Sequence, residues 1–357
     1  MAISEPPVRS EARPQTRAES KTRTARRPPT LAHVAALAGV SPATASRVLS
    51  GSAHVSPDAR MLVEDAVQRL GYVRRRSAPR LVGPGESIAV VLCEDSSRVF
   101  ADPFFARLLQ GVKRELEGGP QHVVLMVGGN EEWRTAAEYL RAGHTAGVLL
   151  VGPHRDHPLV RLHTASRGPV VVAGRPLSPI RLPYVDADNR GGARAALEHL
   201  VATGRRKIGV IAGPPDVGPG IDRLAGYRAA ATDAGIEIEG LIVRGDFSRT
   251  SGEHAMNRLL ARRPDLEAVA AASDLMALGA MRALHRAGRR IPDDVAVVGF
   301  DDLPIARRIR PALTTVRQPV EDLGARAVRE LLGLIGGRSA PERGVILKSK
   351  LIVRDSA

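Results

Sequence analysis

The chain has 357 residues, of which 43% are hydrophobic and 3% aromatic, and it carries a formal net charge of +14. This length favours about two domains with an aliphatic core, and no apolar run reaches the roughly 18 residues that a membrane span needs. Because the N-terminus lacks the apolar segment of a secretory signal, and a single cysteine (Cys93) excludes an intramolecular disulfide framework, we expect a cytoplasmic protein with no membrane partner.

The positive charge is concentrated at the N-terminal end. Residues 1–80 hold 14 Lys and Arg against 6 Asp and Glu, whereas the rest of the chain holds 38 against 32. A basic end of this kind favours a polyanionic partner, with nucleic acid first. Residues 1–28 are rich in Pro, Arg, Ser and Thr without an apolar period, which predicts a disordered basic tail. The alternative for this tail is a merely soluble segment without a partner.

Residues 29–72 predict a small domain of three short helices. Thr30 is suited to cap the first helix, and Gly39 ends it because glycine readily takes a positive φ. Ser41 caps the second helix and Ser56 the third, each with proline at the first helical position. The third helix is expected to bury one apolar face, made of Leu62, Val63, Ala66, Val67 and Leu70.

Three short helices with a tight glycine turn between the first two are typical of a helix-turn-helix domain. In the second helix, Ala45 and Val48 are predicted to face inward. The opposite face is thin and polar with one long cation, which suits the major groove of DNA. Its residues are Pro42, Ala43, Thr44, Ser46, Arg47 and Ser50. The alternative is a three-helix bundle without a ligand.

Residues 30–76 resemble the head of the lactose-repressor/galactose-repressor (LacI/GalR) family of bacterial transcriptional regulators. The resemblance is carried by the segments VSPATASRVL, HVSPDAR and LGY. It implies phosphate contacts from Thr30, Ser41, Thr44, Ser46, Ser50 and His54, and base contacts from Pro42, Ala43 and Arg47. Neither Pro42 nor Ala43 has a side chain that can hydrogen-bond, so we expect this helix to read few bases directly, with Arg47 as its main base contact.

Residues 73–85 are predicted to form a hinge that departs from the family pattern. The family usually has Pro-Asn followed by a short helix containing A-R-x-L, whose leucine wedges into the minor groove. Here the segment reads VRRRSAPRLVGPG, with Leu81 at the wedge position. Pro79 removes a backbone hydrogen bond from a helix there, at a cost of about 3 kcal/mol. We expect a short or displaced hinge helix in which Leu81 still inserts.

Four arginines of this hinge are expected to contact phosphates and the narrow minor groove, which would offset the disturbed helix. They are Arg74, Arg75, Arg76 and Arg80. The alternative is a charged linker that touches phosphates only.

From residue 86 to residue 354, short β-branched segments alternate with helical ones. SIAVVLC, KIGVIAG and VAVVGFD are strand-like, and helices are expected at 103–117, 190–203, 222–234, 251–262 and 275–287. This alternation predicts parallel sheets covered on both faces, with ligands at the C-terminal ends of the strands. The predicted fold is therefore an all-α helix-turn-helix head followed by an α/β sensor of two doubly wound parallel-sheet subdomains.

The sensor half also resembles the LacI/GalR family, whose sensors are similar to periplasmic sugar-binding proteins. DPFFARLLQGV, DRLAGYRAA, SDLMALGAMRAL and VAVVGFDD are among the segments that carry the resemblance. It implies an effector-binding and dimerisation domain at residues 86–354, with crossovers between subdomains near 186–188, 314–317 and 344–346. The usual tetramerising leucine-heptad tail is missing, so we expect a homodimer.

The same resemblance implies seven effector-binding residues, namely Phe104, Phe105, Arg175, Arg223, Phe247, Ser273 and Asp301. Arg223 is expected to be the main donor to ligand hydroxyls or a carboxylate. We also expect it to begin a helix, where the helix dipole disfavours a cation, so that a functional role is favoured. The alternatives are that the phenylalanines belong to the core and that Asp301 caps a turn.

No catalytic motif was found in the sequence, so we predict neither catalytic residues nor a cofactor. His154, Asp156, His157 and His163 are interpreted as part of a solvated loop and not as metal ligands.

The prediction that results is a regulator that binds a pseudo-palindromic double-stranded operator. A small-molecule effector, in first place a carbohydrate, would release it. The competing hypothesis is a solute-binding module or sugar-acting enzyme with an accessory basic tail.

Overall fold

The computed structural model describes the part of the chain considered below. The described residues are 30–49, 55–70, 72, 87–128, 132–155, 157–164, 168–177, 181–341 and 344–357. The chain divides into two compact units, residues 1–81 and 82–357. The predicted tail (1–28) and hinge (73–85) lie outside the described residues, and the boundaries 29–72 and 86–354 remain predictions.

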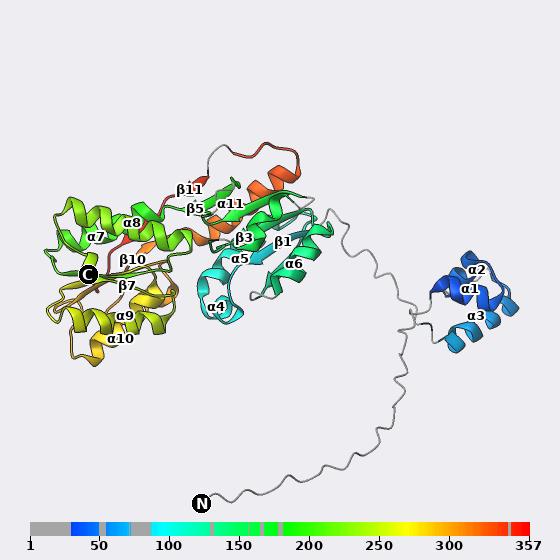
Figure 1. Ribbon diagram of the computed structural model, residues 1–357, viewed down its shortest axis with the longest axis horizontal. Coiled ribbons are helices and arrows are strands. Elements are labelled where there is room, and N and C mark those ends of the chain that lie inside the picture. Colours follow the sequence, from blue (N-terminus) through cyan, green and yellow to red (C-terminus); the bar gives the residue numbers. More distant parts are fainter. Residues whose placement is uncertain are drawn as a thin grey trace, which may run out of the picture. The chain divides into compact units, whose positions relative to one another are not determined.

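The first unit contains the three predicted helices (Figure 1). They are α1 (Leu31–Ala38), α2 (Pro42–Leu49) and α3 (Pro57–Leu70). Thr30 caps α1 by accepting a hydrogen bond from a backbone N–H at 3.4 Å, and Gly39 ends it with φ 65°. The core forms where Val34, Ala45 and Val63, one from each helix, are fully buried. The small Ala45 lets the helices of the helix-turn-helix approach closely.

The predicted apolar face of α3 is partly wrong. Val63 and Ala66 are buried, but the side chain of Leu62 is 51% exposed. At roughly 100° per residue, Leu62 lies about 90° from the centre of the stripe formed by the other four positions. It therefore falls at the edge of the face and points to solvent.

The described residues of the second unit form two six-stranded sheets. The first has the order β11-β5-β4-β3-β1-β2 and all its neighbouring strands are parallel. Its strands are β1 (Ser87–Leu92), β2 (His122–Val127), β3 (Gly147–Val151), β4 (Val170–Ala173), β5 (Tyr184–Ala187) and β11 (Val345–Leu347). Strands β1, β3 and β4 are buried along their whole length, as expected for a parallel sheet with both faces covered.

The second sheet has the order β12-β10-β9-β8-β6-β7. Its strands are β6 (Ile208–Ala212), β7 (Ile242–Arg244), β8 (Ala268–Ala271), β9 (Ala296–Phe300), β10 (Thr314–Arg317) and β12 (Lys350–Ile352). All its pairings are parallel except the one between β10 and β12. The two predicted doubly wound subdomains are thus present, and each is called below by its place in the chain, the first and the second subdomain.

Helices cover both sheets, so the second unit consists of two α/β lobes (Figure 1). In the first subdomain the helices are α4 (Ser96–Ala101), α5 (Pro103–Leu116), α6 (Glu132–Arg141) and α11 (Val320–Ile335), and in the second they are α7 (Asn189–Ala202), α8 (Gly218–Asp233), α9 (Arg249–Arg262) and α10 (Asp274–Arg286). Helices α5 and α11 pack so closely that a Cβ added to Gly111 would lie 1.8 Å from the Glu321 carbonyl oxygen. None of the described helices is both long and apolar enough to span a bilayer.

The chain passes between the two sheets three times. It leaves the first sheet after β5 and returns after β10, so that α11 packs against the first sheet. It then adds β11 to the first sheet and β12 to the second. Three adjacent passages form the connection about which two such subdomains can change their relative angle.

Candidate functional site

The candidate nucleic-acid face lies on α2 in the first unit. Ser41 caps this helix, since its Oγ accepts the backbone N–H of Thr44 at 3.1 Å and lies 2.9 Å from the Thr44 hydroxyl. Pro42, Ala43 and Arg47 are exposed, while Thr44 and Ser46 are half-buried. Ser46 and the one long cation of α2, Arg47, thus lie on the side away from its two buried residues, while Thr44 lies at the border of the buried side.

The other predicted DNA contacts lie outside the described residues. They are Ser50, His54, Arg74, Arg75, Arg76, Arg80 and Leu81. Their roles remain predictions from the sequence.

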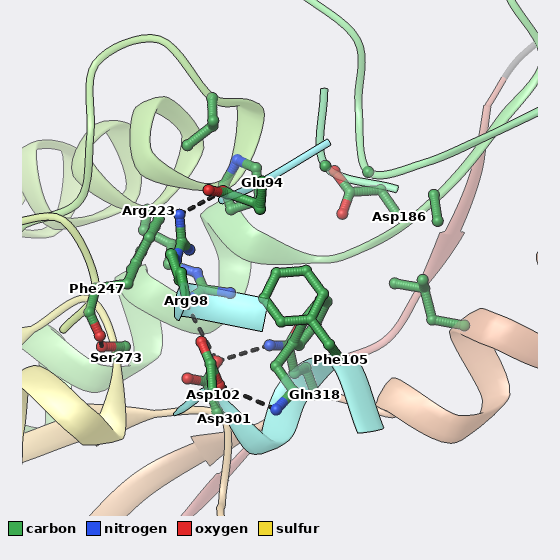
Figure 2. A pocket seen from close by; sticks show the side chains of 17 residues that line it. Glu94, Arg98, Asp102, Phe105, Asp186, Arg223, Phe247, Ser273, Asp301 and Gln318 are labelled. Atoms are coloured by element: carbon green, nitrogen blue, oxygen red, sulfur yellow. Dashed lines mark hydrogen bonds and ion pairs between the residues drawn. The ribbon is translucent and has the colours of Figure 1, made fainter. Parts of the chain in front are cut away.

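The candidate effector site is a pocket between the two subdomains of the second unit (Figure 2). It encloses about 680 Å³ of empty space, including space open to solvent. Six of the seven predicted effector residues line it: Phe104, Phe105, Arg223, Phe247, Ser273 and Asp301. The fold therefore brings together six residues that the resemblance had named in distant parts of the chain.

Arg223 lies at the centre of the pocket's hydrogen-bond network and is 4% exposed. Its Nε donates to Asn189 Oδ1 at 2.9 Å, and its Nη1 donates to the Ala272 carbonyl at 2.5 Å and to Asp301 Oδ1 at 3.3 Å. The guanidinium also stacks on the Phe300 ring, 3.7 Å from its centroid. Nη2 makes no hydrogen bond within the described residues, so its two N–H groups remain for a ligand.

The expected reason for the role of Arg223 is wrong in one respect. Helix α8 begins at Gly218 and not at residue 222, so Arg223 lies in its second turn. The positive end of the helix dipole acts mainly on the first turn and contributes little here. Arg223 is instead held by its carboxylate, carbonyl and amide partners.

The Asp301 carboxylate accepts hydrogen bonds from α8 and from the segment that follows β10. Its Oδ1 accepts from Arg223 and also from Gln318 Nε2 at 2.6 Å, and Gln318 directly follows β10, where the chain returns to the first subdomain. The backbone of Asp301 has φ 118°, and that of Phe247 has φ 69°. Such conformations are costly for residues with a Cβ and concentrate at functional sites. Both residues line the pocket.

Ser273 and Asp102 combine local capping with exposure to the pocket. Ser273 Oγ accepts the Met276 N–H at 3.2 Å and so caps α10. Asp102 accepts the Phe104 N–H at 3.0 Å and caps α5. Helix capping is thus enough to explain why each residue is present, and each residue also lines the cavity.

Three aromatic rings give the pocket its apolar walls. Phe104 and Phe105 meet edge to face with centroids 5.4 Å apart, and Phe105 is almost fully buried. Phe247 approaches from the second subdomain, and the Arg98 guanidinium lies 5.0 Å from its centroid. Phe105 belongs to the hydrophobic core and also lines the pocket. For this residue, the predicted role and the alternative therefore both hold.

Charged residues in the pocket that were not predicted include two carboxylates and one arginine. Glu94 follows β1 and forms an ion pair with Arg98 of α4. Arg98 Nε is buried and has no hydrogen-bond partner in the described structure. Asp186, in β5, accepts from the backbone N–H of Arg175 at 2.9 Å and from Asn189 Nδ2 at 3.0 Å. A polar residue at the C-terminal end of a buried strand is the signal that could have found both carboxylates.

Arg175 is the one predicted effector residue that does not line the pocket. Its guanidinium donates from Nε and Nη2 to the two carboxylate oxygens of Asp222, each at 2.7 Å. Its neighbour Gly174 lines the pocket instead.

His154, interpreted from sequence as part of a solvated loop, is only 32% exposed and contacts Asp216 and Glu94. Within the described residues, no group of three or more His, Cys, Asp or Glu side chains is arranged to hold a metal ion.

Burial raises the pKa of three pocket carboxylates, Asp102, Asp186 and Asp301. Desolvation raises the pKa of Asp301 to about 6, against the lowering effect of Arg223, and desolvation likewise raises the pKa of Asp186 to about 6. Both groups are therefore ionised at neutral pH and become protonated as the pH falls through about 6.

We expect effector affinity to fall at acid pH, because a protonated Asp301 accepts fewer hydrogen bonds from a ligand. For one required carboxylate with a pKa of about 6, the loss relative to pH 7.5 is about tenfold at pH 5. Calorimetric titration across this range measures it. The variant Asp301→Asn, whose side chain tolerates a positive φ, should bind weakly with a flatter profile. An affinity of the wild-type protein that does not change from pH 7.5 to pH 5 would contradict the expectation.

Comparison with known proteins agrees with this geometry. Residues 30–75 match the model of bacterial regulatory proteins of the lacI family, and residues 197–357 match a periplasmic binding protein-like domain. The HTH-type transcriptional regulator CelR of Thermobifida fusca is 45% identical over 336 residues, which is 93% of this chain and 99% of CelR. The chain belongs to the LacI family of bacterial regulatory proteins.

Other members extend the similarity of this LacI-family chain. The ribose operon repressor of Halalkalibacterium halodurans is 32% identical over 92% of this chain and 96% of that protein. A structure of the CelR–cellobiose complex has a TM-score of 0.74 at 43% identity and covers 92% of this chain and 100% of that one. The lac repressor dimer bound to operator has a TM-score of 0.69 at 30% identity, over 92% and 99% of the two chains. These relatives are transcriptional regulators.

Proposed function

We propose that this LacI-family chain is a repressor that leaves its operator when a neutral saccharide binds between the sensor subdomains, and that cellobiose is the first effector to test. The observation that carries the proposal is the pocket itself. It combines aromatic walls with carboxylates and arginines that line the cavity. The CelR–cellobiose complex, at 43% identity, supports the choice of ligand.

The charges of the pocket favour a neutral ligand over an anionic one. Two arginines, Arg98 and Arg223, stand against four carboxylates, which are Glu94, Asp102, Asp186 and Asp301. Saccharide hydroxyls are both donors and acceptors, so they suit such a mixed set, while the apolar faces of sugar rings pack on aromatic rings. An anionic ligand would meet an excess of negative charge.

The DNA-binding part of the proposal rests on α2. A homodimer would place two copies of this helix on the half-sites of a pseudo-palindromic operator, with the hinges between them. The effector changes operator affinity only if it binds the two arrangements of the sensor unequally. In this proposal the protein acts in the cytoplasm as a regulator and not as an enzyme or a solute-binding module.

The test uses the full-length chain and an operator selected from a random duplex library. Fluorescence anisotropy measures operator affinity with and without cellobiose. We expect cellobiose at saturation to weaken operator binding at least about tenfold, within the usual range of allosteric coupling. Sucrose and an anionic sugar such as glucuronate serve as comparison ligands, and both should have little effect.

Two outcomes would contradict the proposal. If the library yields no bound sequence, the chain is not a sequence-specific DNA-binding protein. If an operator is found but a panel of neutral saccharides neither stabilises the protein against heat nor changes operator affinity, the effector belongs to another chemical class. Thermal stabilisation reports binding directly, because a ligand that prefers the folded state raises its stability.

A further inference from the structure

Two ion pairs join the subdomains beside the pocket. His154, which follows β3, places Nδ1 2.7 Å from Asp216 Oδ2. Arg175, which follows β4, makes the bidentate pair with Asp222 at 2.7 Å for both bonds. Both aspartates belong to the second subdomain, between the end of β6 and the second turn of α8. A backbone bond from the Arg155 N–H to the Asp216 carbonyl, at 2.6 Å, lies beside the first pair.

His154 is held by a carboxylate on each side. Its Nε2 lies 3.2 Å from Glu94 Oε1, while its Nδ1 faces Asp216. The hydrogen bond to Glu94, together with that to Asp216, raises the pKa of His154 to about 9 against the opposing effect of burial. The imidazole is therefore a cation at neutral pH, and both ring N–H groups donate. Its contact joins a charge of the first subdomain to one of the second.

The backbone at this edge is packed without spare space. A Cβ added to Gly218, the first residue of α8, would lie 2.5 Å from the Arg175 carbonyl oxygen. Glycine thus permits the segment after β4 to approach the start of α8. The two ion pairs and this close approach show that the two subdomains are in contact beside the pocket, whose lining includes the adjacent Gly174 and Val217.

The first ion pair is also connected to the interior of the pocket. Glu94, which accepts from His154, lines the cavity and pairs with Arg98. Arg98 in turn lies over Phe247 of the second subdomain. A movement that separates His154 from Asp216 therefore removes one of the two carboxylates that orient the His154 ring, and this ring contacts Glu94.

We propose that the His154–Asp216 and Arg175–Asp222 pairs are latches that hold the two sensor subdomains closed over the pocket, and that His154 also aims Glu94 at the effector. Arg175 and His154 are then positioning residues, which influence the effector without touching it. The consequence for gene regulation rests on the proposed function, whereas closure itself does not.

The closed arrangement and effector affinity are linked by mass action. If the closed form is the one that binds, the apparent dissociation constant rises as the closed fraction falls. Removing both latches should open the sensor and weaken effector binding about tenfold. The effector concentration needed for half-maximal release of the operator should rise by the same factor.

The test compares full-length variants by distance and by affinity. Spin labels are placed on Arg141→Cys of α6 and Arg258→Cys of α9, both exposed and in different subdomains. The native Cys93 is buried and its pKa is raised, so it should not be labelled. Labelled protein is diluted with unlabelled protein so that pulsed dipolar spectroscopy reads the distance within one chain.

Without ligand, the double variant Asp216→Asn/Asp222→Asn should show a longer and broader distance distribution than the parent, and its affinity for cellobiose should be about tenfold lower. Asp265→Asn is the matched control, since it breaks exposed pairs with Lys207 and Arg263 inside the second subdomain. It should change neither readout. Circular dichroism checks that all variants are folded.

An unchanged distance distribution in the folded double variant would overturn the latch proposal, whatever its affinity for cellobiose. Because the distance is measured without ligand, failure of cellobiose to bind any variant would count against the proposed effector and leave this result intact. The exchange Arg175→Asp/Asp222→Arg provides a second check. It should restore the parent distance that Arg175→Asp alone lengthens, and a folded exchange variant with the longer distance would also contradict the proposal.

Discussion

Replacing Arg223 with methionine is expected to lower effector affinity about 100-fold or more. Hydrogen bonds from a charged donor contribute about 1.5–3 kcal/mol each, and every 1.4 kcal/mol corresponds to a factor of ten. Arg223 offers the two N–H groups of Nη2 to the pocket and also orients Asp301, so the substitution removes direct contacts and disturbs a second ligand-binding group. Calorimetric titration with cellobiose, or with whichever saccharide the panel identifies, measures the loss.

The same substitution should reduce stability. It leaves the Asp301 carboxylate, 6% exposed, without its cationic partner, and removal of one member of a buried ion pair costs about 3 kcal/mol or more. Urea unfolding at pH 7.5 measures this. The control is Arg228→Met on the same helix, whose pair with Glu239 is about half exposed on both sides and should contribute little. Equal losses of affinity in the two variants would show that Arg223 has no special role.

Local features explain why the head could be predicted almost residue by residue. Thr30, Ser41 and Ser56 begin helices by accepting backbone N–H groups a few residues away, so the evidence for each helix start lies within one turn. Leu62 shows the limit of this reasoning. Whether the Leu62 side chain is buried depends on how far around α3 the core extends. The other two helices set this extent, and the period of α3 does not.

The sensor strands could also be predicted, because buried parallel strands are continuous apolar segments. The pocket could be predicted only where the family resemblance supplied residues. Glu94, Asp186 and Gln318 come from the ends of β1, β5 and β10, and only the order of strands in two sheets brings these ends together. No local pattern records that order.

Arg175 illustrates a second kind of limit. Its side chain was expected to contact the effector, yet it pairs with Asp222, a residue 47 positions away in the other subdomain. An arginine near a pocket can point into the pocket or toward the opposite subdomain. Which of the two occurs depends on the positions of the carboxylates in the opposite subdomain. That information appears only when the two subdomains are placed together, and it changes the expected role of Arg175 from ligand contact to closure.

The pocket network also touches the connections between the subdomains. Asn189, which binds Arg223, begins the helix after the first passage, and Gln318, which binds Asp301, lies at the second. A ligand that forms hydrogen bonds with Arg223 and Asp301 therefore alters the hydrogen bonds of the segments about which the subdomains turn. This gives a physical route from ligand binding to a change in the angle between them.

The substitution Arg47→Ala is expected to weaken binding of the selected operator about 10-fold to 100-fold. Arg47 is exposed on the outer side of α2, and an arginine that donates two bonds to guanine contributes about 1–3 kcal/mol of discrimination. Its neighbours on this face, Pro42 and Ala43, cannot replace those bonds. Fluorescence anisotropy with the operator and with a scrambled duplex measures the change.

The comparison of the two duplexes decides what Arg47 does. If it reads a base, the variant should lose affinity for the operator and little for the scrambled duplex, so the ratio between them falls. If it contacts phosphate only, both affinities should fall together, and the dependence on salt should become less steep by about one counterion. Arg69→Ala is the matched control, because Arg69 is an exposed arginine of α3 paired with Asp65 at 2.9 Å. A loss of the same size in this control would mean that the general charge of the head, and not the face of α2, sets operator affinity.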